Sequence, residues 1–239
     1  SMPDPALPNF EDRFQRSTIG AGYSNLNGGT WGISNNFMYQ NAKGSTAYYI
    51  DYENTFTTAS DYTAEYNLKE VSKGTLGPRF GAVYGYVDAN NYGIALLNSN
   101  ANRLETNMIV NGVWGTQVNT SLPAGFDFTK LHTIRIEKSG STYKYFVDTM
   151  LKETKTSTNL GAGKVGYLSS DDEADFGYLA VSNKVNGSGI FDYYKPIPGT
   201  IEAVHYNSGG EGVGYHDTSG GNTGGKYIRN DNVDIRDNP

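Results

Sequence analysis

The sequence contains no cysteine, which excludes disulfide bonds, thiolate zinc sites and cysteine nucleophiles. It is also short of basic charge, since 19 Lys and Arg residues against 25 Asp and Glu residues give a net charge of −6. A nucleic-acid surface needs clustered Lys and Arg, so nucleic-acid partners are not expected. No apolar run approaches the roughly 20 residues of a membrane-spanning helix, and no stretch has the period of an amphipathic helix. We therefore expect neither a nucleic-acid nor a membrane partner.

Glycine and tyrosine are abundant, with 30 and 19 copies among 239 residues. Tyrosine suits a pleated, half-buried strand, and glycine marks the turns between strands. A single β-sandwich commonly runs to about 200–250 residues, so a chain of this length forms one large β-domain or two ordinary domains. The composition therefore predicts an all-β protein with enough residues for a sizeable core.

The central part, residues 79–114, predicts three consecutive strands joined by short polar turns. Its first strand alternates large apolar residues with small ones, and this period of two separates two faces. We expect the large residues to lie in the core and the small ones to form the floor of a groove on an open sheet face. The large residues are Phe80, Ala82, Tyr84 and Tyr86, and the small ones are Gly81, Val83 and Gly85.

Similar alternation recurs from residue 9 to residue 182. Asn35-Asn36 predicts a hairpin turn within residues 30–40, and Ser139-Gly140-Ser141 predicts another between residues 131–138 and 142–148. About a dozen short strands at this spacing predict a β-sandwich. We expect one open sheet face to carry the polar side chains Glu65, Asn67, Lys69, Arg103, Glu105, Asn107, Arg135 and Glu137.

The character of the chain changes near residue 195. Two prolines, Pro196 and Pro198, flank a linker, and nine of the 27 residues from 199 to 225 are glycine. This tail has too few apolar residues to offset the entropy of its ordering. We therefore predict a β-sandwich domain over residues 1–195 and a separate segment over residues 196–239.

A glycine-flanked aromatic strand at 79–87 followed by Asp88-Ala89-Asn90-Asn91-Tyr92, together with residues 132–137, 143–148, 163–167 and 174–176, forms a recognisable pattern. It resembles the concanavalin A-like, LamG-type jelly rolls attached to bacterial glycoside hydrolases. The resemblance spans residues 9–183 and implies a concanavalin A-like β-sandwich, or jelly roll, with a Gly-rich C-terminal extension. These stretches mark a fold and carry no catalytic signature.

A second pattern occupies residues 198–203, 209–217, 220–227 and 233–235. It resembles the opening of a family 6 carbohydrate-binding module, which implies that residues 196–239 are a linker and the incomplete start of such a module. The resemblance further implies a secreted, modular parent enzyme that acts on a polysaccharide. The partners expected for this chain are accordingly a polysaccharide or oligosaccharide and the catalytic and binding modules of the same parent chain.

Sugar binding requires an aromatic ring against the apolar C–H face of a pyranose and planar polar groups for its hydroxyls. Trp114 is the first candidate, because it lies in a turn-like context between Gly112 and Gly115. Arginines would suit an anionic glycan, since a guanidinium matches a carboxylate in a bidentate manner. The predicted ligand-binding residues are Trp114, Arg103, Asn107, Arg135, Glu65 and Tyr49.

Glycan hydrolysis usually requires two carboxylates about 5–9 Å apart. Glu65, Glu105 and Glu137 could supply them, but the Glu-x-Asp-x-x-Glu string of the similar family 16 jelly-roll enzymes does not occur. No catalytic residue is therefore predicted, and the sequence favours a non-catalytic carbohydrate-binding module that holds a glycan on its concave sheet face. Two alternatives stay open, a glycoside hydrolase or polysaccharide lyase with concave-face carboxylates, and a structural spacer.

A structural calcium ion is implied by the resemblance, at the point where the first and last strands meet. Hard oxygen ligands of the kind that calcium prefers are available there in Glu11, Asp12, Asp171, Asp172 and Asp175, and the predicted metal ligands are Glu11, Asp12 and Asp175. Residues 169–175 hold four carboxylates in seven positions, whose mutual repulsion a cation would relieve; the other interpretation is a solvated acidic turn. The lack of cysteine and the Tyr-, Asn-, Gly- and Thr-rich composition resemble those of bacterial proteins that are secreted or held at the cell surface.

Overall fold

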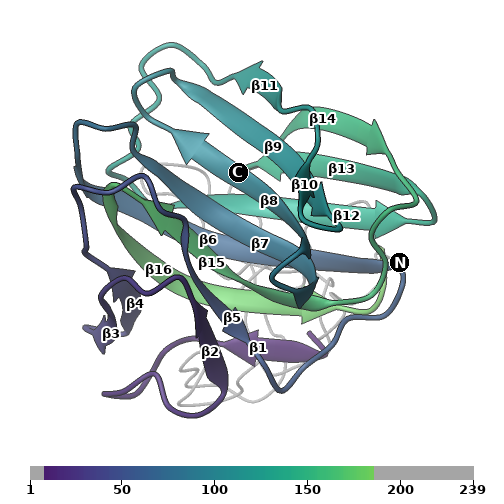
Figure 1. The fold of residues 1–239 in the computed structure, drawn as a ribbon, viewed down its shortest axis with the longest axis horizontal. Coiled ribbons are helices and arrows are strands. Elements are labelled where there is room, and N and C mark those ends of the chain that lie inside the picture. Colours follow the sequence, from purple (N-terminus) through teal and green to yellow (C-terminus); the bar gives the residue numbers. More distant parts are fainter. Residues whose placement is uncertain (1–7, 186–239) are drawn as a thin grey trace, which may run out of the picture. The chain divides into compact units, whose positions relative to one another are not determined.

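The computed structural model describes residues 8–185 of the chain. These residues form sixteen β-strands and no helix, so none could cross a membrane as a helix (Figure 1), and the predicted all-β class is confirmed. The predicted segment of residues 196–239 lies outside the described part. The strands are β1 (Phe10–Asp12), β2 (Tyr23–Leu26), β3 (Trp31–Ser34), β4 (Phe37–Gln40), β5 (Tyr49–Glu53), β6 (Tyr62–Lys73), β7 (Arg79–Asp88), β8 (Asn91–Asn98), β9 (Arg103–Val110), β10 (Val113–Trp114), β11 (Val118–Ser121), β12 (His132–Ser139), β13 (Thr142–Val147), β14 (Met150–Thr156), β15 (Lys164–Ser170) and β16 (Asp172–Ser182).

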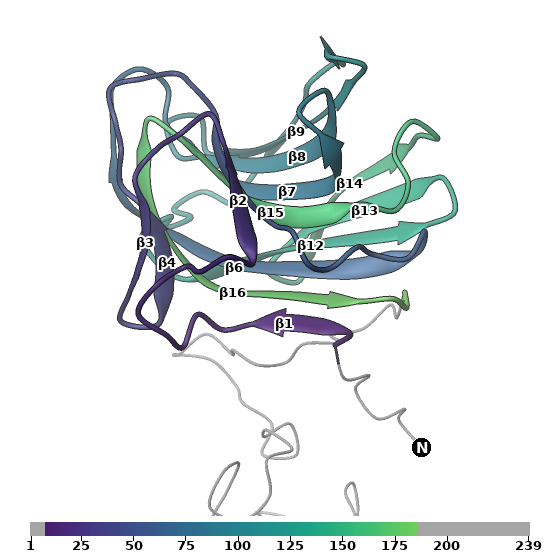
Figure 2. The same ribbon diagram turned by 60° about the horizontal axis from the view of Figure 1, so that its bottom comes forward.

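Two antiparallel sheets pack face to face as the two layers of a sandwich (Figure 2). Sheet A has the order β14-β13-β12-β6-β16-β4-β3, and β1 also pairs with β16. Sheet B has the order β10-β9-β8-β7-β15-β5-β2, and β11 also pairs with β9. The predicted meander of residues 79–114 is the run β7-β8-β9-β10 in sheet B. The predicted β-sandwich is therefore confirmed.

The predicted turns also form. Asn35 and Asn36 both adopt positive φ, 53° and 61°, between the paired residues Ser34 and Phe37. Gly140, with φ 57°, lies in the turn between β12 and β13. Asparagine and glycine tolerate this left-handed conformation better than other residues, which is why these short polar stretches reverse the chain.

Between the sheets lies one apolar core, built from alternate residues of each long strand. In β6, for example, Tyr62, Ala64, Tyr66 and Leu68 are all fully buried. Several buried tyrosines in this core hydrogen-bond through their hydroxyl groups. Tyr66 donates to the carbonyl of Val83 at 2.8 Å, and the hydroxyl groups of Tyr84 and Tyr145 lie 2.5 Å apart. These partners offset the loss of water around buried hydroxyl groups.

Tyr86 departs from the predicted alternation. Phe80 and Tyr84 lie in the core as expected, but Tyr86 lies on the outward face of sheet B, where it stacks on Tyr52 with ring centroids 4.1 Å apart. The cause is a register shift in the β7–β8 pairing after Tyr84, where Gly85 has a φ of 56°. One irregular residue reverses the direction of the next side chain, so Tyr86 is buried as expected, but in the outward cluster and not in the core between the sheets, where it was predicted.

Candidate functional site

The outward face of sheet B faces the viewer in Figure 1 and carries a second apolar cluster. Two members of this cluster, Val83 and Ile94, face each other across β7 and β8, and a third, Leu168, faces Gly81 across β15 and β7. Leu26, Tyr48 and Tyr52 pack against the cluster from its edge. Its buried members are Ile50, Val83, Tyr86, Tyr92, Ile94, Leu96, Ile109 and Leu168.

Gly81, Val83 and Gly85 do not form the open groove floor that their small size predicted. All three are buried, and Val83 has no exposed surface. The space above them is used internally, because Tyr48 and Tyr52 pack into this cluster. The prediction of an open groove along β7 was therefore wrong, and the accessible part of this face lies elsewhere.

An open hollow of about 390 Å³ lies on this face where the β2–β3 and β4–β5 connections approach β8 and β10. Its volume falls at the lower end of the range of small-ligand sites, about 300–1,000 Å³. Trp114 is 49% exposed here, and Tyr48 meets its ring nearly edge-on, with centroids 5.4 Å apart. The side chains that line it are Asn27, Thr46, Tyr48, Tyr92 and Trp114.

Trp114 is held by a short hairpin. Asn111 and Gly112 form its turn with φ values of 52° and 76°, and the amide of Gly115 donates to the carbonyl of Met108 at 2.9 Å. The opposite wall is tied down as well, because the Asn27 amide group donates to the carbonyl of Tyr48 at 3.0 Å. The aromatic surface is therefore largely formed before any ligand arrives.

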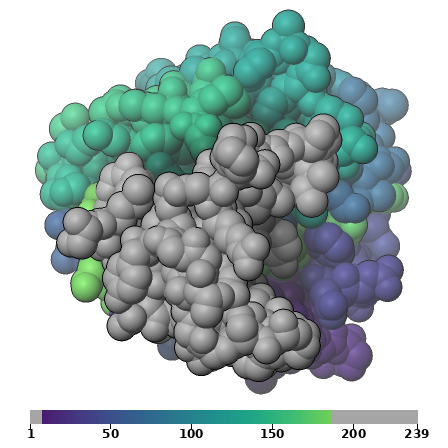
Figure 3. All heavy atoms as spheres, turned by 180° about the vertical axis from the view of Figure 1, so that it is seen from behind, coloured from purple at the N-terminus to yellow at the C-terminus, as the bar shows by residue number. Residues whose placement is uncertain are grey.

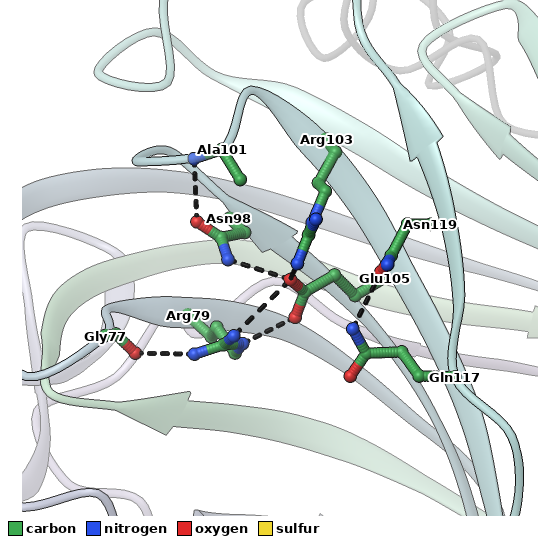
Figure 4. A network of polar contacts seen from close by, with 8 residues as sticks. All are labelled: Gly77, Arg79, Asn98, Ala101, Arg103, Glu105, Gln117 and Asn119. Atoms are coloured by element: carbon green, nitrogen blue, oxygen red, sulfur yellow. Dashed lines mark hydrogen bonds and ion pairs between the residues drawn. The ribbon is translucent and has the colours of Figure 1, made fainter.

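A charged network lies on the same face (Figure 4). Glu105, 2% exposed, accepts hydrogen bonds from Arg79, Arg103 and Asn98, at 2.5 Å from Arg79 Nε and 2.8 Å from Asn98 Nδ2. Arg103 donates through both Nε and Nη2, at 2.9 and 2.7 Å. Burial alone would raise the pKa of Glu105, but these hydrogen bonds lower it below its ordinary value. Glu105 is thus held as a carboxylate, and two guanidinium groups share its single negative charge.

The charged network and the hollow are linked along β9. Glu105 and Ile109 face the same way, about 13 Å apart at the usual rise of a strand, and Ile109 pairs with Trp114. Asn107 lies between them and donates to the carbonyl of Gly115 at 3.0 Å. Along the outward face of β9, aromatic rings therefore lie beside Ile109, and the cationic, hydrogen-bonding side chains of Arg79 and Arg103 lie beside Glu105.

Three of the six predicted ligand-binding residues belong to this face: Trp114, Arg103 and Asn107. Tyr49 does not, because it alternates with Ile50 and points to the opposite side of β5, next to Gly29. The neighbouring Tyr48 lines the hollow instead. Alternation along β5 would have distinguished the two tyrosines if the face of Ile50 had been known.

Arg135 and Glu65 lie on the outward face of sheet A, the side from which Figure 3 is viewed. They face each other directly across β12 and β6, and Arg135 stacks over the ring of Phe146, 4.2 Å from its centroid. Glu137 lies on the same face of β12, whereas Glu105 belongs to the other sheet. The single polar face predicted from sequence is therefore wrong, since its eight residues divide between the two outer faces of the sandwich.

The residues predicted to bind calcium already have protein partners. Asp12 accepts hydrogen bonds from the Phe14 amide at 2.8 Å and from Arg16 Nη1 at 2.7 Å. Glu11 pairs with Arg13, and Asp175 lies 3.6 Å from the ammonium group of Lys69.

Glu11 and Asp12 also lie far from Asp175. Glu11 faces Ala180 across the β1–β16 pairing, five residues along β16 from Asp175, or about 16 Å. Within residues 8–185, no three or more His, Asp or Glu side chains form a group that could hold a metal ion. Glu11, Asp12 and Asp175 do not fit a common calcium site, and a structural calcium ion stays a prediction.

Comparison with solved structures places the sandwich among known folds. The family 66 carbohydrate-binding module from Bacillus subtilis aligns with a TM-score of 0.59 and 18% identity over 67% of this chain and 95% of that module. The β-glucanase of Bacillus licheniformis aligns with a TM-score of 0.56 and 16% identity, over 73% and 98% of the two chains. A B. subtilis protein of unknown function with a galectin-like fold gives a TM-score of 0.61 and 8% identity, over 76% and 98%. At these identities the likeness establishes the concanavalin A-like and galectin-like sandwich fold.

No protein-family model and no curated protein sequence matches the chain.

Proposed function

We propose that this domain binds a glycan without cleaving it, on the outward face of sheet B. The observation that carries the proposal is the half-exposed ring of Trp114, set edge-on against Tyr48 in a preformed hollow. A flat aromatic ring on a short hairpin matches the apolar C–H face of a pyranose. Asn27 and Thr46 line the same hollow and provide polar groups for sugar hydroxyls.

The fold likeness supports this class of function in general terms. One similar structure is a carbohydrate-binding module and another is a β-glucanase, so sandwiches of this kind serve both binding and hydrolysis. The residues of the site must decide between the two.

Binding without catalysis fits the carboxylates of this face better than hydrolysis does. A glycosidase places two carboxylates on either side of the scissile bond, about 5–9 Å apart. Glu105 has neither Glu65 nor Glu137 as a neighbour, since both lie on the other sheet. Its lowered pKa and its two arginine partners also make it a poor proton donor.

The role that we propose is attachment of a larger enzyme to its polysaccharide. A binding module raises the local concentration of substrate for the catalytic modules of the same chain. We place the parent protein outside the cell or at the bacterial cell surface, where polysaccharides are found.

Affinity electrophoresis against soluble plant, algal and bacterial polysaccharides tests the proposal. We expect retarded migration on at least one glycan, and loss of that retardation in Trp114→Ala. The matched control is Val113→Ala, because Val113 is the preceding residue, is 68% exposed and points to the other side of β10. Retardation that survives in Trp114→Ala would remove the hollow from the proposal, and no retardation on any glycan would favour a spacer.

The enzymatic alternative has its own assay. The same glycans are incubated with the protein and then analysed for new reducing ends and for the absorbance of unsaturated uronates. We expect neither product. Product formation that is abolished by Glu105→Gln or Glu65→Gln would replace the binding proposal with a glycoside hydrolase or a lyase.

A further inference from the structure

Two adjacent aspartates at the β15–β16 turn have opposite surroundings. Asp171 is fully buried but satisfied, because its carboxylate accepts hydrogen bonds from the amides of Gly44 at 2.8 Å and Leu76 at 2.5 Å. Asp172 is also fully buried, yet neither of its carboxylate oxygens has a hydrogen-bond donor among residues 8–185. A buried carboxylate without a donor is strongly unfavourable unless something neutralises it.

Glu70 brings a second carboxylate to Asp172. A register shift in the β6–β16 pairing follows Glu173, so β16 passes from Lys73 to Glu70 as partner within three residues. Glu70 is 7% exposed and accepts a hydrogen bond from the hydroxyl group of Ser99. Burial, the charge of Glu70, a hydrogen-bonding contact between the two carboxyl groups and the charge of Asp171 raise the pKa of Asp172 to about 9, while Lys73 opposes the shift. Two acidic groups thus share a largely buried site.

A single proton does not satisfy this arrangement. A proton on one carboxyl group forms one hydrogen bond to the other group and leaves the second oxygen of Asp172 without a donor. A cation can contact both oxygens of Asp172 and an oxygen of Glu70 together. The main chain of Asp172 is already fixed, because its carbonyl accepts hydrogen bonds from Gln40 Nε2 at 3.0 Å and Ser169 Oγ at 2.5 Å. The backbone that carries this carboxylate is thereby held in place.

We propose that Asp172 and Glu70, with the hydroxyl group of Ser99, hold a divalent cation that prefers hard oxygen ligands, Ca²⁺ in the first place. Calcium takes six to eight oxygen ligands at about 2.3–2.6 Å, and water commonly completes the set. This site differs from the one predicted on Glu11, Asp12 and Asp175, although the sequence already marked Asp172 as an available oxygen ligand.

Such an ion would join the two layers of the sandwich. Asp172 and Glu70 belong to β16 and β6 in sheet A, whereas Ser99 lies in the β8–β9 turn of sheet B. The residue before Ser99 is Asn98, which donates to Glu105 in the charged network. The cation would therefore fix the end of sheet B from which Arg103 and Glu105 reach the candidate glycan site.

Titration of chelator-treated protein with CaCl₂, and separately with MgCl₂, tests the proposal by calorimetry and by melting temperature. We expect Ca²⁺ to bind with measurable heat and to raise the melting temperature by several degrees, since a ligand specific for the native state stabilises it. Asp172→Asn should lose both responses. Glu173→Gln is the matched control, because it removes the same charge from the next residue, which pairs with Lys43 at 3.1 Å.

Two results would overturn the proposal: wild-type protein that neither binds nor responds to either cation at millimolar concentration, or Asp172→Asn that responds as wild type does. If Asp172→Asn fails to fold, Glu70→Gln takes its place, with the same expected loss. In a further outcome, the melting temperature of chelator-treated wild type falls as pH rises towards 9 while neither cation changes it. That result would mean that Asp172 and Glu70 share a proton and do not hold a cation. Glycan retardation is measured separately, so a failed cation site leaves the binding proposal standing or falling by itself.

Discussion

The ring of Tyr48 meets the ring of Trp114 nearly edge-on, at an interplanar angle of 71° and a centroid distance of 5.4 Å. The two residues are far apart in sequence and come from strands at opposite sides of sheet B, since Trp114 belongs to β10 and Tyr48 immediately precedes β5. The β4–β5 connection and the hairpin that carries Trp114 therefore bring the two rings together over this face. An edge-to-face pair of this kind contributes about 0.5–1.5 kcal/mol beyond its buried area.

Tyr48→Ala should weaken glycan binding, because Trp114 would lose the ring that fixes its orientation and the hollow would lose one wall. We expect roughly a tenfold loss of affinity, equivalent to about 1.4 kcal/mol. Isothermal titration or affinity electrophoresis with the glycan found in the screen provides the measurement.

Tyr49→Ala is the control for Tyr48→Ala, since Tyr49 is the next residue and points to the other side of β5. It should retain wild-type affinity even if its melting temperature falls. Equal loss in both variants would mean that the effect comes from general destabilisation of β5 and not from the hollow.

Arg103 should favour anionic glycans over neutral ones. Its Nε and Nη2 groups bind Glu105, and among the described residues Nη1 has no hydrogen-bond partner. Because Arg79 also pairs with Glu105, the network carries an excess of one positive charge on a protein whose net charge is −6. Arg103→Gln should reduce retention on polygalacturonate several-fold, and should leave retention on a neutral galactan unchanged.

The control for Arg103→Gln is Arg135→Gln on the other sheet. It should preserve the wild-type preference between the two polysaccharides, with folding checked by melting temperature. If Arg135→Gln changes that preference and Arg103→Gln does not, the ligand binds on sheet A. Such a result would restore the grouping that the sequence first suggested.

Local patterns predicted the fold well because strand alternation and turn residues act over a few positions. Phe80 and Tyr84 lie in the core, and Asn35-Asn36 forms its turn, as expected from sequence. Tyr86 was misplaced because a single glycine in the left-handed region changes which side the next residue faces. Periodicity alone does not show such an irregularity.

The candidate site was harder to predict because it depends on which strands are neighbours. Glu65 and Glu105 both alternate with core residues, and nothing in that alternation tells that they belong to different sheets. The assignment follows from long-range pairing, which places β6 beside β12 and β9 beside β8. Trp114 was identified correctly as an exposed ring because its turn-like surroundings are local, whereas Tyr48 gains its role only through contact across the sheet.

His132 should make stability depend on pH near neutrality. Burial lowers its pKa, but its ring nitrogens lie 2.9 Å from Asp148 Oδ2 and 2.7 Å from the Asp127 carbonyl, and the net effect raises the pKa. Because the pKa of His132 is raised in the folded state, the protonated ring stabilises the fold fully below the unfolded pKa of about 6.5. This stabilisation is lost as pH rises through the folded pKa. The difference in melting temperature between wild type and His132→Gln should therefore be larger at pH 5 than at pH 9.

Each variant is compared with wild type at the same pH, so that the effects of other titrating groups, including Asp172, cancel. Asp148→Asn should lose most of the same pH dependence as His132→Gln, because it removes the negative charge that favours the protonated ring. A constant difference between wild type and His132→Gln across this range would show that His132 acts only through packing, for example its stacking on Phe126 at 4.0 Å.

The Tyr84 and Tyr145 hydroxyl groups should show strong coupling in a double-mutant cycle. Both side chains are fully buried, and their hydroxyl oxygens are 2.5 Å apart. Tyr84→Phe removes one partner and leaves a buried hydroxyl group on Tyr145 without it, which costs about 1–3 kcal/mol. Tyr145→Phe has the same consequence for Tyr84. The double variant removes both polar groups, so its loss of unfolding free energy should be smaller than the sum of the single losses by about 1 kcal/mol or more. Urea denaturation of the four proteins measures each term, and additive losses would mean that the two hydroxyl groups find other partners and that this contact does not stabilise the core.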